Sequence, residues 1–254
     1  MRDYSLQGKV LLGASLPGGN PGALRWVDDA AVLNIALSTN EETRQESWSG
    51  MKRTTATLSG PTEATFNLTL HHMSRENLAL ALYGETRTVA AGSITGESFP
   101  PVADGDLVAL DRGGISNVQI TDSNATPATL AEDTHFRVDD VEGGVIEMLD
   151  TSTFTQPFLA DYEHMASDDV TMFTAAPPIR YLLFSGLNRV DEYRNERVRV
   201  RLYKMKFNPV SQLDLINESF GSLELSGTLL FEPTAALDDE FGGYGRMEQL
   251  KAEA

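Results

Sequence analysis

Strict alternation of apolar and polar residues constrains this chain more than any other feature of its sequence. In EATFNLTLHH (63–72), the even-numbered residues up to 70 are apolar and the odd-numbered residues up to 69 are polar. Successive side chains of a β-strand point to opposite faces, so this pattern predicts a strand with one face on a core. The segments 55–59 and 222–232 repeat the pattern. The sequence therefore predicts a mainly β fold whose strands bury one apolar face and leave a polar face toward water.

One segment, SRENLALALYG, departs from the strand pattern. Ser74 can cap the N-terminus of a helix, and Leu78, Ala81 and Leu82 fall on one helical face. Gly84 can adopt the left-handed conformation that ends a helix. We predict one short helix over residues 75–83, packed on a sheet.

The stretch RVRVRLYKMKF (197–207) predicts a long strand with Arg197, Arg199 and Arg201 on one face. Its apolar positions change from even to odd near residues 202 and 203, which indicates a bulge or a passage between two packing environments. The formal net charge of −17 opposes binding to phosphate. Carboxylates on a neighbouring strand or on a neighbouring subunit suit the arginines better than nucleic acid does, and both of these alternatives stay open.

Proline pairs and acidic residues mark a middle section, from FPPVADGD to TAAPPIR. We interpret residues 99–180 as an acidic β-rich insertion rather than an independent domain. Residues 1–98 would form the N-terminal part of the main β domain, and residues 181–254 would complete it. The tail after Phe231 has no clear periodicity, so we expect it to be partly disordered until it is bound.

The polar segment 38–53 is longer than a usual hairpin connection, which predicts a functional or mobile loop. Trp48 and Met51 lie in the middle of this segment, where permanent exposure to water would be unfavourable. We therefore expect another surface to cover the loop.

Catalytic and metal sites find little support in the sequence. The chain has no cysteine, which excludes disulfides and cysteine-based zinc sites. His71 and His72 are adjacent in a strand and point to opposite faces. The segment that begins at Asp122 resembles a calcium loop, but Pro127 stands where a glycine is needed. We find no nucleophile elbow, phosphate loop or dinucleotide fingerprint, and predict no enzyme activity, catalytic residue, metal or cofactor.

Membrane insertion and export also lack a signal. No run of about 18 apolar residues occurs, and the first residues lack the uninterrupted apolar stretch of a secretory signal. We expect no membrane partner and synthesis in a cytoplasm.

Several segments together resemble the major tail tube proteins of tailed bacteriophages, most of all those with long non-contractile tails. The resemblance rests on GKVLLG, PGALRWVDDAAVLNIALSTNEETRQESWSG, ATFNLTLHHMSRENLALALYG and RVRVRLYKMKFNPVSQLDLINESFGSLELSGTLLFEP. It implies a β-sandwich with a flanking helix, of which six copies form a ring whose inner strands close one shared β-barrel. Stacked rings form the tube of the virion tail, assembled in the host cytoplasm, through which DNA leaves the capsid.

The resemblance also implies partners and contact residues. The partners are further copies of the chain, a tape measure protein, a tail terminator, tail tip proteins and double-stranded DNA that passes without adhering. A ring of six copies would carry a formal charge of −102, six times −17, which suits a conduit for DNA. We expect contacts between subunits or rings at Glu41, Glu42, Arg44, Glu46, Trp48 and Arg53, a lumen lined by Glu63, Thr65, Asn67, Thr69, Glu224, Ser226 and Thr228, and an interface charge strip at Arg197, Arg199 and Arg201.

Three alternatives remain. A type VI secretion tube protein shares the fold but is normally shorter. A β-sandwich binding or decoration module on a virion surface would carry aromatic clusters at its loop tips, whereas the aromatics here are scattered. An acid-pair hydrolase would use the pairs 28–29 or 168–169, although glycosidases surround their carboxylates with aromatics.

Overall fold

The computed structural model describes residues 3–190 and 196–250 and shows a mainly β protein with one α-helix. The chain divides into two compact units, residues 1–86 with 170–254 (unit 1) and residues 87–169 (unit 2). No helix in the described residues is long and apolar enough to cross a membrane.

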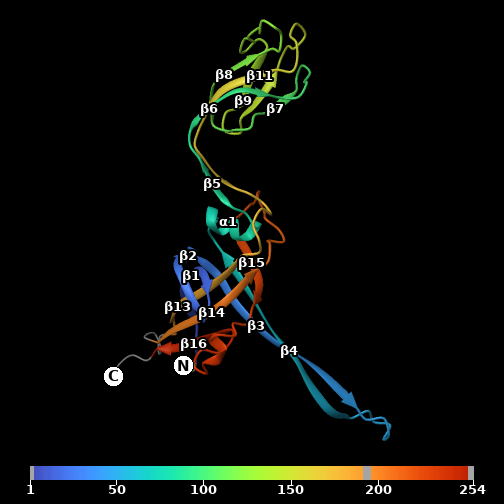
Figure 1. The fold of residues 1–254 in the computed structure, drawn as a ribbon, viewed down its shortest axis with the longest axis vertical. Helices are drawn as coiled ribbons and strands as arrows, with labels where there is room; N and C mark the ends of the chain where they lie inside the picture. The colour runs from blue at the N-terminus through green and yellow to red at the C-terminus, as the bar shows by residue number, and fades with distance from the viewer. Residues whose placement is uncertain (1–2, 191–195, 251–254) are drawn as a thin grey trace. The chain divides into compact units, whose positions relative to one another are not determined.

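Unit 1 is built on one antiparallel sheet with the strand order β2-β1-β13-β14-β15-β4-β3, and β16 pairs with β14 beside this path (Figure 1). Its hydrophobic core combines residues of β1, β13, β14, β15 and β4 with α1. The elements are β1 (Leu6–Leu16), β2 (Asn20–Trp26), β3 (Ala30–Gln45), β4 (Thr54–Leu70), α1 (Arg75–Leu82), β13 (Ile179–Asn188), β14 (Arg197–Phe207), β15 (Leu223–Leu229), the short 3-10 helix Ala235–Leu237 and β16 (Gly245–Leu250).

The alternation in the sequence matches the two faces of this sheet. In the inner half of β4, Ala64, Phe66, Leu68 and Leu70 are buried on the core face. β15 pairs with β4 in antiparallel register and buries Leu223, Leu225 and Leu229 on the same side. The prediction of a mainly β fold from period-two patterning is confirmed.

The predicted helix forms, but its end and its buried face differ from the prediction. The Ser74 hydroxyl accepts a hydrogen bond from the Asn77 backbone N–H, as expected of an N-cap. The residue in the left-handed conformation is Tyr83, with φ 52°, and not Gly84. The buried face is formed by Asn77, Leu80 and Ala81.

Asn77 lies on the buried face of α1 because its side-chain amide forms hydrogen bonds inside unit 1. Its Nδ2 donates to the carbonyl of Val27 at 3.1 Å and of His72 at 3.3 Å, and its Oδ1 accepts from the Arg25 guanidinium at 2.8 Å. A polar residue with satisfied partners can be buried, so the apolar pattern alone misplaced the face.

The change of phase in β14 is a bulge that also joins two packing environments. Arg180 pairs with Met205 and Leu182 with Leu202, so Tyr203 and Lys204 together face the single residue Tyr181. Leu202 is buried in the main core, and Tyr203 in a small second core with Tyr181 and Ala235. Both explanations offered by the sequence therefore apply.

Two segments are more ordered than their sequences indicated. The first half of the predicted loop 38–53 is strand, because β3 extends to Gln45, which pairs with Thr54 of β4. The tail after Phe231 forms the short 3-10 helix and β16, which pairs with β14 from Arg197 to Leu202. Long-range pairing holds both segments, and local periodicity does not report such pairing.

Unit 2 has a hydrophobic core of its own, with Ile120, Phe136, Ile146, Met148 and Phe158 among its fully buried residues. It holds two three-stranded sheets, β7-β10-β9 and β6-β11-β8. Its strands are β6 (Gly92–Ser98), β7 (Leu107–Ala109), β8 (Ile115–Thr121), β9 (Phe136–Asp140), β10 (Val145–Met148) and β11 (Leu159–His164).

The insertion lies earlier in the chain than the expected range 99–180. Strands β5 (Thr86–Val89) and β12 (Ser167–Val170) pair with each other where the chain leaves unit 1 and returns to it. The proline pair at 100–101 belongs to unit 2, whereas the pair at 177–178 belongs to unit 1. The paired strands, and not the prolines, mark the boundary.

The charge of the chain is concentrated in unit 2. Residues 87–169 contain sixteen acidic side chains, three arginines and no lysine, a formal net charge of −13, which leaves −4 of the total −17 for unit 1. Most of the negative charge therefore lies outside the sheet that carries the expected lumen residues.

The environment of Asp122 predicts that the stability of unit 2 depends on pH. Its buried carboxylate accepts the Ala128 N–H at 2.7 Å, and this hydrogen bond lowers the pKa of Asp122. A carboxyl whose pKa is lower in the folded state stabilises the fold above its unfolded pKa of about 3.9, and this stability is lost as the pH falls through the folded pKa. We expect the hydrogen-exchange protection of unit 2 peptides, corrected for the intrinsic exchange rate at each pH, to fall as the pH drops below about 3.9.

Asp122→Asn tests the cause. This variant should be less protected than the parent chain near neutral pH and should show a smaller fall in protection at low pH. Asp139→Asn removes an exposed carboxylate of β9 and serves as the control. Equal pH dependence in the parent and in Asp122→Asn would refute the assignment.

Candidate self-assembly surface

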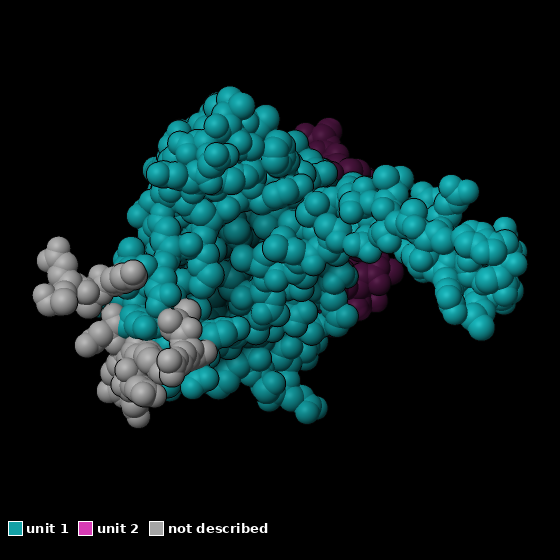
Figure 2. Space-filling view, turned by 90° about the horizontal axis from the view of Figure 1, so that it is seen from below, with its two compact units in different colours: residues 1–86, 170–254 teal, residues 87–169 magenta. Residues whose placement is uncertain are grey.

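Unit 1 includes a hairpin arm that contributes no residue to the hydrophobic core. We define the arm as residues 39–61, the outer parts of β3 and β4 with their connection. Cross-strand pairing continues through it to Gln45 and Thr54, yet every residue from 37 to 63 except Glu46 is exposed. The arm projects from the sheet of unit 1 (Figures 1 and 2). Two strands exposed on both faces gain little from burial, so a partner surface would stabilise the arm.

The tip of the arm presents apolar side chains on an ordered turn. The Glu46 N–H donates to the Arg53 carbonyl at 2.9 Å, and the Glu46 carboxylate accepts the Ser49 hydroxyl. Trp48 is 78% exposed and Met51 is 68% exposed. The structure brings the expected contact residues together on this arm and its tip: Glu41, Glu42, Arg44, Glu46, Trp48 and Arg53.

β3 is also an edge strand. Among the described residues it pairs with β4 alone. Its core-side residues become more exposed toward the arm, from Leu33, which is half-buried, to Ile35 at 41% and Leu37 at 71%. A 16-residue edge with an apolar side is a template for pairing with another chain.

An open groove of about 910 Å³ lies beside this edge. Its walls come from the start of β1, from β13 and β14, and from the first half of β3, and a hollow is visible on one face of unit 1 (Figure 2). Its apolar lining residues include Val10, Leu33, Ile35, Phe184, Val200 and Met247. The core face of the sheet is therefore incompletely covered here.

The expected lumen residues lie on one polar face of the sheet. Cross-strand pairs join Glu224 to Thr69, Ser226 to Asn67 and Thr228 to Thr65. Glu63 extends the row on β4 and pairs with Ser38 of β3. These side chains are exposed or half-buried, and most are short and uncharged. Positions 63, 65, 67, 69, 224, 226 and 228 thus form a continuous surface.

Two of the three strip arginines have an ion-pair partner in the same chain. Arg199 Nη1 lies 3.7 Å from Glu248 Oε2, and Arg201 Nε lies 3.7 Å from Glu248 Oε1. Glu248 is on β16, directly opposite Arg199 in the register. Arg197 is exposed. The expectation of carboxylates on a neighbouring strand is met for Arg199 and Arg201 by a residue that sequence analysis did not single out.

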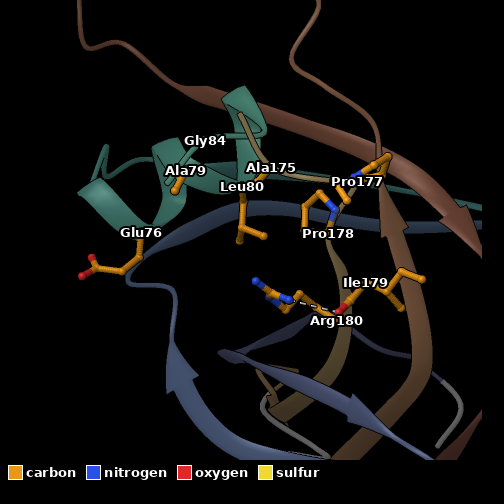
Figure 3. Close-up of a pocket in the computed structure, with 10 residues that line it drawn as sticks. Glu76, Ala79, Leu80, Gly84, Ala175, Pro177, Pro178, Ile179 and Arg180 are labelled. Atoms are coloured by element: carbon orange, nitrogen blue, oxygen red, sulfur yellow. Dashed lines mark hydrogen bonds between the residues drawn. The ribbon is translucent and has the colours of Figure 1, made fainter. Parts of the chain in front are cut away.

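A pocket beneath α1 offers little chemistry (Figure 3). It has a volume of about 390 Å³, and Glu76 and Arg180 are its charged residues among small or apolar ones. The Glu76 carboxylate points away from the other lining residues, and Arg180 Nη1 donates to the Ile179 carbonyl at 3.2 Å (Figure 3). The described residues contain no group of three or more His, Cys, Asp or Glu placed to hold a metal ion.

A family model matches the chain across both units. Residues 3–248 match the family described as Protein of unknown function UCP028589. The chain belongs to this family. No curated protein matches the chain. The features of unit 1 that bear on function are the arm, the edge strand and the polar face.

Proposed function

We propose that this chain is a structural protein that polymerises into a tube of stacked hexameric rings, as the major tail tube proteins of tailed bacteriophages do. The observation that carries the proposal is the arm with its edge strand. A long β-hairpin that leaves its own core and exposes Trp48 and Met51 at the tip is suited to a contact with another copy.

Closure of a shared barrel would pair the free backbone groups of such an edge. Unpaired strand edges favour association, and a closed barrel removes them. In the proposed ring, β3 of one copy would pair with a strand of its neighbour, and the apolar side chains at Ile35 and Leu37 would be covered. The groove beside β3 gives the neighbour an apolar surface to fill.

The polar face of β4 and β15 is the proposed lining of the bore. Threonine, serine and asparagine side chains leave room for water and offer no cationic attraction to phosphate. Since unit 2 carries −13 of the net charge, the proposed bore does not need a strongly acidic wall. DNA would pass because few groups in the lining bind it, and the tape measure, terminator and tip proteins would be the other partners.

Negative-stain microscopy at rising protein concentration tests the proposal. We expect hollow rods with a regular axial repeat above a critical concentration. The measurement should be made with and without the arm tip, because rods are expected only when the tip is intact. Solid fibres, or monodisperse particles at every concentration and with seeds added, would overturn the tube.

A further inference from the structure

A second surface of unit 1 is basic although the chain as a whole is acidic. Antiparallel pairing aligns three rows across β1, β13, β14 and β16, and directly paired side chains share one face of the sheet. One row is Lys9, Ser185, Arg199 and Glu248. The second row ends in Arg201 and Arg246, and the third contains Arg197. We define the basic face as Lys9, Arg197, Arg199, Arg201, Arg246 and Glu248.

Positive charge on this face exceeds negative charge. Within the described residues, Glu248 is the carboxylate that forms ion pairs with these arginines, at 3.7 Å from Arg199, 3.7 Å from Arg201 and 2.7 Å from Arg246. Three of the five cationic side chains of the basic face therefore share one acid. Like charges placed opposite each other on neighbouring strands, as Arg201 and Arg246 are, destabilise a sheet unless an anion lies between them. One carboxylate neutralises part of this charge only.

Apolar residues lie among the cations. Trp26, Leu187 and Leu250 belong to the same three rows and are all partly exposed. The Lys9 ammonium lies 5.1 Å from the centre of the Trp26 ring. Arginine and aromatic residues are enriched in protein interfaces. Because apolar and aromatic side chains lie among the cations, this composition fits an acidic protein surface better than a bare phosphate backbone.

Unit 2 is the matching surface within the same sequence. Its net charge of −13 over residues 87–169 contrasts with the arm, where acidic and basic residues are balanced. Two complementary surfaces on one chain give a head-to-tail contact between copies. We propose that the basic face of one copy binds the acidic surface of unit 2 of another copy. This inference deepens the proposed self-assembly by naming a second contact.

Removal of charge from the exposed side of the basic face tests the contact. We expect Arg197→Gln with Arg199→Gln to weaken self-association at least tenfold in sedimentation at low salt, and to remove most of its dependence on salt between 50 and 500 mM NaCl. The control is Arg75→Gln with Lys206→Gln, which removes the same charge elsewhere in unit 1. Unchanged association in the basic-face variant would overturn the inference.

Zero-length carbodiimide coupling identifies the partner surface, because Lys9 is the sole lysine of the basic face and unit 2 has none. In a mixture of 14N- and 15N-labelled full-length protein, we expect mixed-isotope peptides that join Lys9 to acids of residues 87–169. Coupling within one copy only, or to acids of unit 1 only, would overturn the inference. So would binding of a fluorescent DNA duplex that displaces the coupling and is lost in the basic-face variant.

The outcomes separate this inference from the proposed function. Rods that form normally without a Lys9 crosslink to unit 2 would refute the contact and leave the tube intact. The crosslink in small oligomers that never become rods would support the contact and count against the tube.

Discussion

A variant in which Asn-Gly replaces residues 40–61 is expected to remain a folded monomer at concentrations at which the parent chain assembles. Thr39 and Thr62 pair across the hairpin, so a two-residue turn can join them. The deletion removes no core residue, because the whole segment except Glu46 is exposed. Tryptophan hot spots contribute about 2 kcal/mol or more to an interface, so we expect the critical concentration to rise by roughly 30-fold or more. Light scattering as a function of protein concentration measures the critical concentration.

Trp48→Ala separates the contact of the tip from the presence of the arm. We expect this substitution alone to account for much of the rise in the critical concentration. It leaves the hairpin pairing unchanged, so the effect would belong to the contact made by the indole ring. Phe173→Ala removes an aromatic ring of similar exposure, 73% against 78%, elsewhere in unit 1 and should assemble as the parent does. Equal critical concentrations for the parent and the deletion variant would show that the arm has no part in assembly.

The sequence predicts the parts of unit 1 that obey local rules. Alternation locates the inner half of β4 and β15, because each strand has one buried face. Ser74 locates the start of α1 through its cap, and the phase change locates the bulge at Tyr203. In each case a few neighbouring residues contain the whole physical signal.

The parts that were missed depend on distant partners. Residues 38–45 are polar on both faces, so their strand state follows from pairing with β4 and leaves no period in the sequence. Glu248 meets Arg199 and Arg201 across some fifty residues of chain, and no motif links them. Tyr83 ends α1 in a conformation for which Gly84 is the better candidate by propensity.

The distribution of charge between the two units bears on how a conduit for DNA could work. A total of −17 suggested walls acidic enough to repel DNA, but −13 belongs to unit 2. The face with Thr65, Asn67 and Ser226 has a formal charge of only −2, from Glu63 and Glu224, and positions 63, 65, 67, 69, 224, 226 and 228 include no cation. A lining can bind DNA weakly simply because it lacks cations. Such a lining needs only one polar face without cations, whereas a lining that repels DNA needs many acidic side chains around the bore.

Phe66 and Thr65 give the sharpest test of which face of the sheet holds unit 1 together. Phe66 is 1% exposed and packs edge-to-face on Phe207 with ring centres 5.0 Å apart. Gly227 lies opposite it on β15, where a Cβ would come within 2.7 Å of the ring. We expect Phe66→Ala to lower the free energy of unfolding by about 3–5 kcal/mol, measured by urea denaturation with tryptophan fluorescence.

Thr65→Ala on the same strand should change that free energy by no more than about 0.5 kcal/mol, because the threonine is exposed on the polar face. Similar losses in the two variants would mean that the polar face is packed in the isolated chain, and it could not then line a bore. A large difference would mean that the core side chain Phe66 supports the fold and the polar side chain Thr65 does not. A substitution at Thr65 can then be used to test the passage of DNA without loss of the fold.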